Sequence, residues 1–155
     1  MNNIAFFRFE QILPFIHISS VILFISAQFI VIFLARYCLA DANNIKSTMK
    51  GLKRLFLAWF VLIVIIGLSG FLLCSNTTAD PMLKAIIATQ WAVVAFVLVN
   101  IFYMIYRLNL ARKSLANDEI IMVKENLILI CYYFTPLNIV LSFVSVYLGV
   151  AISEF

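Results

Sequence analysis

Long, uninterrupted apolar runs alternate with short polar segments along this chain of 155 residues. Each run is about as long as the roughly 20 residues that an α-helix needs to cross a bilayer. None of the runs contains Lys, Arg, Asp or Glu, and the strands of a membrane barrel would be shorter and would alternate in polarity. The pattern therefore predicts one all-α domain with four transmembrane helices. These helices cover residues 12–35, 55–74, 85–106 and 127–152.

The composition indicates the same environment. Hydrophobic residues make up 65% of the chain and charged residues 12%, whereas soluble domains average about 45–50% and about 25%. A soluble domain of this size would expose large apolar patches to water. We therefore expect the outside of the protein to face a lipid bilayer.

Basic residues gather in two of the segments between the runs. Residues 36–54 carry five Lys or Arg and residues 107–126 carry four, and the remaining two are Arg8 and Lys84. The positive-inside rule places these two segments in the cytoplasm. Both termini and the turn near residues 75–81 are then expected on the outer, periplasmic side of a cell inner membrane. The net charge of +4 reflects this asymmetry, and we expect no nucleic-acid partner.

Local signals refine the ends of the helices. Few helix breakers follow Arg107 or precede Leu127, so the third helix is expected to continue into the cytoplasm and the fourth to start there. The Asp-Pro pair at 80–81 is typical of a helix start, and the Thr-Pro pair at 135–136 predicts a kink. The first run is expected to be a retained span, because its basic cluster follows it, unlike in a signal peptide.

Small or polar residues recur three or four positions apart in each run, which places them on one helix face. Polar side chains are unfavourable in lipid, and small residues let helices approach closely. We therefore predict that these faces point into an antiparallel four-helix bundle. The clearest packing positions are Gly67, Gly70, Asn100, Thr135, Asn138, Ser142, Ser145 and Gly149. The same spacing predicts inward faces through His17, Ser20, Phe24 and Gln28, and through Thr89, Val93, Phe96, Asn100, Tyr103 and Arg107.

The only histidine, His17, is the first candidate for chemistry. It lies roughly 7 Å inside the first run, at 1.5 Å per residue. An ionisable group within a membrane span is a functional candidate, and imidazole is a good ligand for haem iron or copper. The alternative is a hydrogen-bonded core histidine. One histidine cannot supply a bis-histidine site, so a second ligand would have to come from elsewhere, such as the His17 of a second copy in a homodimer.

Several other residues are expected near the same depth. Gln90 and Trp91 lie in the third run, and they are the further candidates for binding a cofactor. Lys84 would stand at the mouth of this pocket or reach the membrane interface. The remaining wall would come from Cys74, Ser145 and Gly149. All seven acidic residues lie outside the runs, and no catalytic pair is visible, so the sequence favours a role that is not enzymatic.

Several segments resemble a known membrane group. These are residues 15–20 around His17, the segments 50–55 and 67–73 at the two ends of the second helix, Trp91, and residues 124–126 followed by Pro136. Together they are similar to the HemJ-type protoporphyrinogen oxidases and the related CopD-like copper-resistance domains. The resemblance implies a four-helix membrane fold and makes His17 a haem-side residue. HemJ proteins carry a lysine four residues after the tryptophan, whereas this chain has Ala95 there and no lysine in that run.

The expected function is that of a small inner-membrane protein, acting as a partner or assembly subunit of a membrane redox complex. Association with haem b through His17 is part of this expectation. One alternative is a HemJ-like oxidoreductase, and another is a carrier for a small solute or copper. The partner would be a second copy of the chain or another membrane protein.

Overall fold

The described chain folds into long helices. A computed structural model describes residues 9–40, 45–74 and 80–153. The elements are α1 (Phe9–Ala40), α2 (Ile45–Cys74), α3 (Pro81–Ala116), α4 (Ile120–Ile128), the π-helical segment η2 (Leu129–Phe134) and α5 (Thr135–Ser153). The last three follow one another without a break, so the described residues form four rods and contain no strand. The predicted turn at 75–79 and both chain ends lie outside the described residues.

Four helices are long and apolar enough to cross a membrane, so the chain has the build of a multi-pass membrane protein. Their candidate spans are Ile12–Tyr37, Ser47–Cys74, Pro81–Ala116 and Ile120–Ile152. The extension of the third helix past Arg107 and the early start of the fourth are both confirmed. Large apolar side chains on the outside, such as Phe15 and Phe33, suit a lipid environment.

The start of α3 shows the predicted capping. The Asp80 carboxylate accepts a hydrogen bond of 2.8 Å from the backbone N–H of Met82, and Pro81 occupies the first turn. At the other end α3 turns into α4 through Asp118, which has a φ of 59°. Asp tolerates this left-handed conformation better than most residues, and the turn therefore stays short.

A π-helical turn, η2, lies directly before the Thr-Pro pair at 135–136 for which a kink was predicted. Thr135 directs both its backbone N–H and its hydroxyl to the carbonyl of Ile130, five residues back, and the hydroxyl bond measures 2.7 Å. The next residue, Pro136, has no N–H to donate. The wider turn rearranges the hydrogen bonds where the proline interrupts them.

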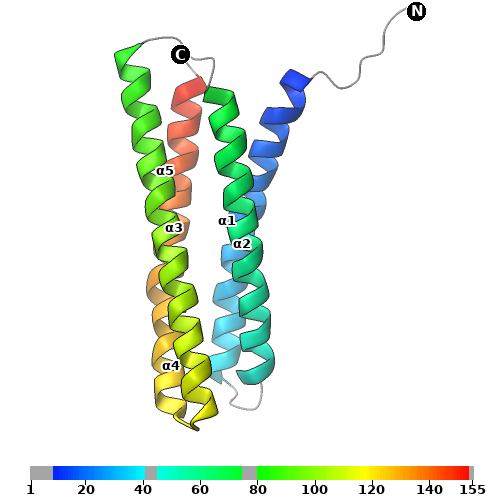
Figure 1. Cartoon of the computed structure of the whole chain (residues 1–155), viewed down its shortest axis with the longest axis vertical. Helices are drawn as coiled ribbons and strands as arrows, with labels where there is room; N and C mark the ends of the chain where they lie inside the picture. Colours follow the sequence, from blue (N-terminus) through cyan, green and yellow to red (C-terminus); the bar gives the residue numbers. More distant parts are fainter. Residues whose placement is uncertain (1–8, 41–44, 75–79, 154–155) are drawn as a thin grey trace, which may run out of the picture.

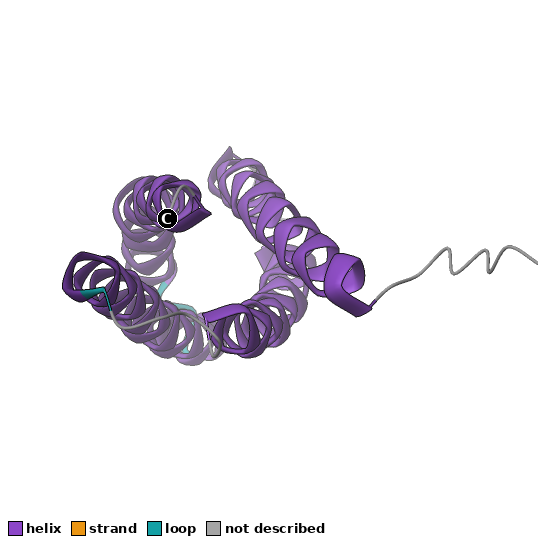
Figure 2. Ribbon diagram, turned by 90° about the horizontal axis from the view of Figure 1, so that it is seen from above, coloured by secondary structure: helices purple, strands orange, loops and turns teal. Residues whose placement is uncertain are grey.

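Between α1 and α2, residues farther along one helix contact residues that come earlier in the other. His17 and Phe24 of α1 meet Ser69 and Trp59 of α2, respectively. α2 packs on α3, α3 packs on α4 and α5, and α5 returns to α1, which closes the ring that is visible in Figure 2. The end of α1, the start of α2, the end of α3 and the start of α4 lie together at the lower end of Figure 1, and these helix ends carry most of the basic residues.

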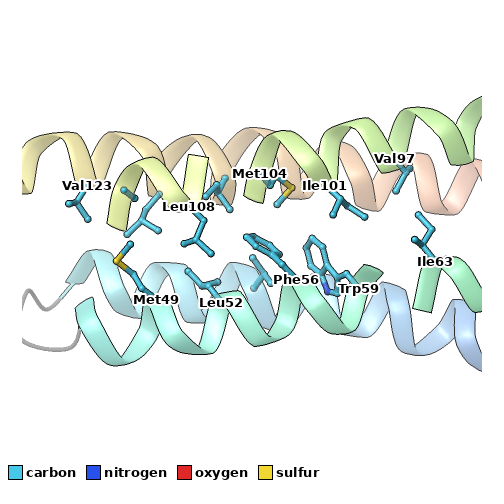
Figure 3. Packing of buried hydrophobic residues seen from close by; sticks show 14 of the residues in the cluster. Met49, Leu52, Phe56, Trp59, Ile63, Val97, Ile101, Met104, Leu108 and Val123 are labelled. Carbon is cyan, nitrogen blue, oxygen red and sulfur yellow. The ribbon is translucent and has the colours of Figure 1, made fainter. Parts of the chain in front are cut away.

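The core follows the spacing of a coiled coil. Buried positions alternate in steps of four and three, which is the 3.5-residue period of left-handed helix packing. In Figure 3 these side chains point toward one another from facing helices. The series are Phe24, Gln28, Val31 and Ala35 in α1; Ile45, Met49, Leu52, Phe56, Trp59 and Ile63 in α2; and Val97, Ile101, Met104, Leu108 and Ala111 in α3.

This core fills only one half of the bundle. We call residues 12–23, 64–74, 81–96 and 143–152 the outer half, because they lie at the end of the bundle away from the helix ends that carry most of the basic residues. In these four segments only Ser20, Ser69 and Leu83 are buried. The inner half is therefore tightly packed, whereas the outer half is loosely packed.

The predicted inward face of α3 was partly wrong. Thr89 is exposed and Phe96 is 52% exposed, whereas Val97 is buried. Asn100 is buried as expected. The run is apolar on every side, so polarity could not distinguish the face that meets the other helices from the face that meets lipid.

Candidate functional site

A polar network crosses the middle of the bundle. The amide of Asn100 donates to the Asn138 side-chain oxygen at 3.0 Å, and the Gln28 amide donates to the Ser142 hydroxyl at 3.0 Å. Ser142 in turn donates to the backbone carbonyl of Asn138 at 2.7 Å. Together with the buried Thr135, these residues link α1, α3 and α5. The network supports helix association, since interhelical hydrogen bonds stabilise membrane bundles.

Two buried polar atoms next to this network have no partner among the described residues. They are the side-chain oxygen of Gln28 and the indole nitrogen of Trp59. Both side chains are fully buried, and Trp59 packs on Phe24, one helical turn from Gln28. One of these atoms is an acceptor and the other a donor.

His17 is held by α2 in a defined orientation. Its Nδ1 lies 2.8 Å from the hydroxyl oxygen of Ser69. The same hydroxyl can donate to the backbone carbonyl of Ile65 at 2.7 Å or to that of Ile66 at 3.2 Å. When its single hydrogen goes to one of these carbonyls, Ser69 accepts from His17, the imidazole hydrogen lies on Nδ1, and Nε2 carries a lone pair.

His17, Gln90 and Trp91 meet at one cavity, as the depth argument predicted. This cavity, which we call the outer hollow, has a volume of about 30 Å³. It lies among α1, α2 and α3, and it is lined by His17, Ile66, Gly67, Gly70, Cys74, Ile87, Gln90, Trp91 and Val94. A Cβ on Gly70 would lie 3.3 Å from His17 Cε1, whereas a Cβ on Gly67 would meet nothing within 4 Å.

The other residues expected at this pocket lie around it. Gly149 lies close to Gln90, because a Cβ built on it would be 3.8 Å from the Gln90 amide nitrogen. Ser145 lines a second cavity of about 40 Å³ that shares Ile66 and Val94 with the outer hollow and reaches Ser142. Lys84 is exposed and is not part of either wall.

The residues of one chain do not fit an enclosed haem. His17 offers a single nitrogen, and in the described part of the chain no three His, Cys, Asp or Glu side chains gather at a metal site. A volume of about 30 Å³ is far below the several hundred Å³ of typical cofactor pockets. It is large enough for one or two waters, or for the head group of a larger molecule.

Two features escaped the sequence reasoning. Ser69, the partner of His17, could have been found by matching depths, since residue 69 lies five positions before the end of its run at 74 and residue 17 five positions after 12. Arg107 donates to the Tyr103 hydroxyl at 2.8 Å and to Asn126 at 3.1 Å. This cluster joins α3 to α4 at the inner end.

The outward side of α3 carries a further unpredicted feature, a row of small residues in the outer half. We call it the α3 small face. All its members are exposed, and each lies three or four residues from another: Ala85, Ala88, Thr89, Ala92 and Ala95. Farther along the same side the residues become large, as at Val99 and Tyr106, which are 64% and 60% exposed. Small residues at this spacing are typical of helix–helix contacts in membranes.

No family model matches the chain, and searches of the curated proteins and of the solved structures found no match. The function is therefore inferred from the geometry of the sites themselves.

Proposed function

We propose that the protein is a non-enzymatic subunit that binds another membrane protein within the bilayer. The α3 small face is the observation that supports this role. A transmembrane helix packs closely where side chains are small, and Thr89 can add a hydrogen bond there. Thr89 now bonds only to its own helix, at 2.9 Å from the carbonyl of Ala85. The proposed partner is therefore a transmembrane helix with small residues on its contact side.

The rest of the bundle suits such a subunit. Its tightly packed inner half continues past the apolar runs, through Ile45 and Met49 of α2 and Leu108 and Val123 of α3 and α4. This part provides a stable base that does not depend on the partner. The partner-binding side of α3 lies in the loosely packed outer half, where side chains can adjust to the surface of the partner.

The proposed setting is the cell inner membrane, with the chain as an antiparallel four-helix bundle. The basic segments 36–54 and 107–126 lie together at one end of the structure. The positive-inside rule then makes that end cytoplasmic and puts both termini outside.

Substitution of the small face tests the proposal directly. Ala88→Leu or Ala92→Leu should block close helix approach, whereas Ala58→Leu adds the same volume to an exposed alanine on α2. The tagged full-length chain is purified from native membranes in a mild detergent, and stoichiometric companions are identified by mass spectrometry. We expect one membrane protein to accompany the wild type and Ala58→Leu, and to fall at least about tenfold in the other two variants.

Two results would overturn the proposal. In the first, the chain purifies alone, or its companion is unaffected by Ala88→Leu and Ala92→Leu. In the second, the only companion is another copy of the same chain, which would show a homodimer instead. A photocrosslinking residue in place of Phe96, beside the small face, should give an adduct with the same partner in intact membranes.

The alternatives have their own readouts. A HemJ-like role with haem at His17 predicts a Soret band that disappears in His17→Ala, and copper handling predicts bound metal in the purified protein. From the single nitrogen of His17 and the size of the outer hollow, we expect neither. Either result would replace the proposed function.

A further inference from the structure

We propose that the outer hollow binds the hydroxyl group of a lipid-soluble alcohol or phenol, with Nε2 of His17 as the hydrogen-bond acceptor. This ligand site is separate from the α3 small face, and it does not depend on a protein partner. The walls come from α1, α2 and α3, on the inward side of α3.

The chemistry of the ligand follows from the orientation of His17. When Ser69 donates to the carbonyl of Ile65 or Ile66, the imidazole hydrogen lies on Nδ1 and Nε2 has a lone pair. In that tautomer a ligand at Nε2 donates a hydrogen. The Gln90 amide, on the α3 wall, can both donate and accept, so it can complete the hydrogen bonds of a hydroxyl.

The hollow selects a neutral head group. No Asp, Glu, Lys or Arg side chain belongs to its lining, so it offers no charge to bind a phosphate or an ammonium group. Most of the wall is apolar, including Ile66, Ile87 and Val94. A lone acceptor in such surroundings is unfavourable unless a donor reaches it.

The size of the hollow indicates how the ligand enters. About 30 Å³ accommodates a hydroxyl and one or two carbons, so only the head of the molecule can be enclosed. Trp91 lines the hollow and is also 41% exposed, so it contacts both the hollow and the surroundings of the bundle. The tail of an amphiphile would therefore pass Trp91 and extend into the membrane.

Trp91 also provides the measurement. The chain has two tryptophans, and Trp59 is fully buried in the inner half. Wild-type protein in phosphatidylcholine vesicles is titrated with 2-bromododecan-1-ol and with 2-bromo-4-octylphenol, whose bromine quenches a nearby indole. The methyl ether of each probe is the matched control, because it keeps the bromine and the tail but cannot donate a hydrogen bond.

We expect a saturable loss of fluorescence with at least one hydroxyl probe, at a membrane concentration about fivefold to tenfold below that of its ether. The saturable component should be absent in Trp91→Phe. Gly67→Leu, which extends into open space, should fill the hollow and abolish saturation without unfolding the chain. Ala58→Leu on the lipid-facing side of α2 should bind like the wild type.

The two probes distinguish the sources of the hydroxyl. Preference for the alkyl alcohol indicates a membrane lipid with a free hydroxyl, and preference for the phenol indicates an aromatic compound such as a quinol. Equal quenching by each probe and its ether would overturn the proposal, and so would unchanged binding in Gly67→Leu. Either result would mean that the hollow holds only water. His17→Leu should weaken binding of the preferred probe by about fivefold to tenfold.

Discussion

Replacing the buried Gln28 by leucine should stabilise the protein. Gln28 is fully enclosed and makes one hydrogen bond to Ser142, while its side-chain oxygen has no partner among the described residues. An interhelical hydrogen bond in a membrane contributes about 0.6 kcal/mol on average. An unpaired buried acceptor costs about 1–3 kcal/mol. Leucine has a similar volume and removes both contributions, so the expected gain is about 1 kcal/mol.

The matched control is Asn138→Leu in the same network. Asn138 accepts from Asn100 at 3.0 Å, and its amide lies 3.5 Å from the Met104 sulfur. Its loss leaves the Asn100 amide without an acceptor, so this variant should lose about 1–3 kcal/mol. Reversible unfolding in mixed micelles of dodecyl maltoside and SDS, followed by circular dichroism, measures both free energies.

A loss of stability in Gln28→Leu would refute the reasoning, because the oxygen would then have a partner. The other buried polar atom without a partner among the described residues is the indole N–H of Trp59, which is a donor. A double-mutant cycle with Trp59→Phe separates the cases, since bonded or water-bridged groups should couple by more than about 0.5 kcal/mol. No coupling together with a gain in stability supports two independent unpaired groups.

Two further outcomes follow from the structure. Gly67→Ala should leave the melting temperature unchanged or raise it, because its Cβ enters open space. Gly70→Ala should lower the melting temperature, because its Cβ would crowd His17. Thermal unfolding of both variants checks this, and equal effects on the melting temperature would contradict it. In a chain without native cysteines, Met82→Cys should react with a membrane-impermeant maleimide in intact spheroplasts, whereas Glu119→Cys should react only after permeabilisation. The opposite labelling pattern would show that the chain has the reverse of the proposed topology.

The sequence was most informative about where helices begin and end. Charged residues bound the apolar runs, and the Asp-Pro pair at 80–81 marks a start because its carboxylate can cap the helix. The extension of α3 to Ala116 was also predictable, because no glycine or proline interrupts that segment. The π-helical form of the break near Pro136 was not, since it depends on where Thr135 finds a carbonyl.

The rotation of the helices was harder to predict. In α3 the sequence could not rank Phe96 against Val97, because both are apolar and only contact with the other helices decides between them. At the outer hollow, by contrast, His17 and Gln90 are rare polar groups, so depth and polarity were sufficient to place them together. The orientation of His17 depended on Ser69, whose hydroxyl the packing stripe had not included.

Small side chains contribute to the hollows of the outer half. The four-and-three series of inward positions continues from the inner half into the outer half, but its residues change. Where the inner half has large side chains such as Leu52 and Phe56, several positions of the outer half have small or polar ones. The outer members of the series are His17 and Val21 in α1, Ile66 and Gly70 in α2, Gln90 and Val94 in α3, and Ser145 and Gly149 in α5, so every helix has at least one small or polar position there. Backbones held in place by the inner core cannot close over such small side chains, so cavities remain between them. His17 and Gln90 bring hydrogen-bonding groups to a wall that is otherwise mostly apolar, which is why the loosely packed half of the bundle is also the half that can bind a ligand.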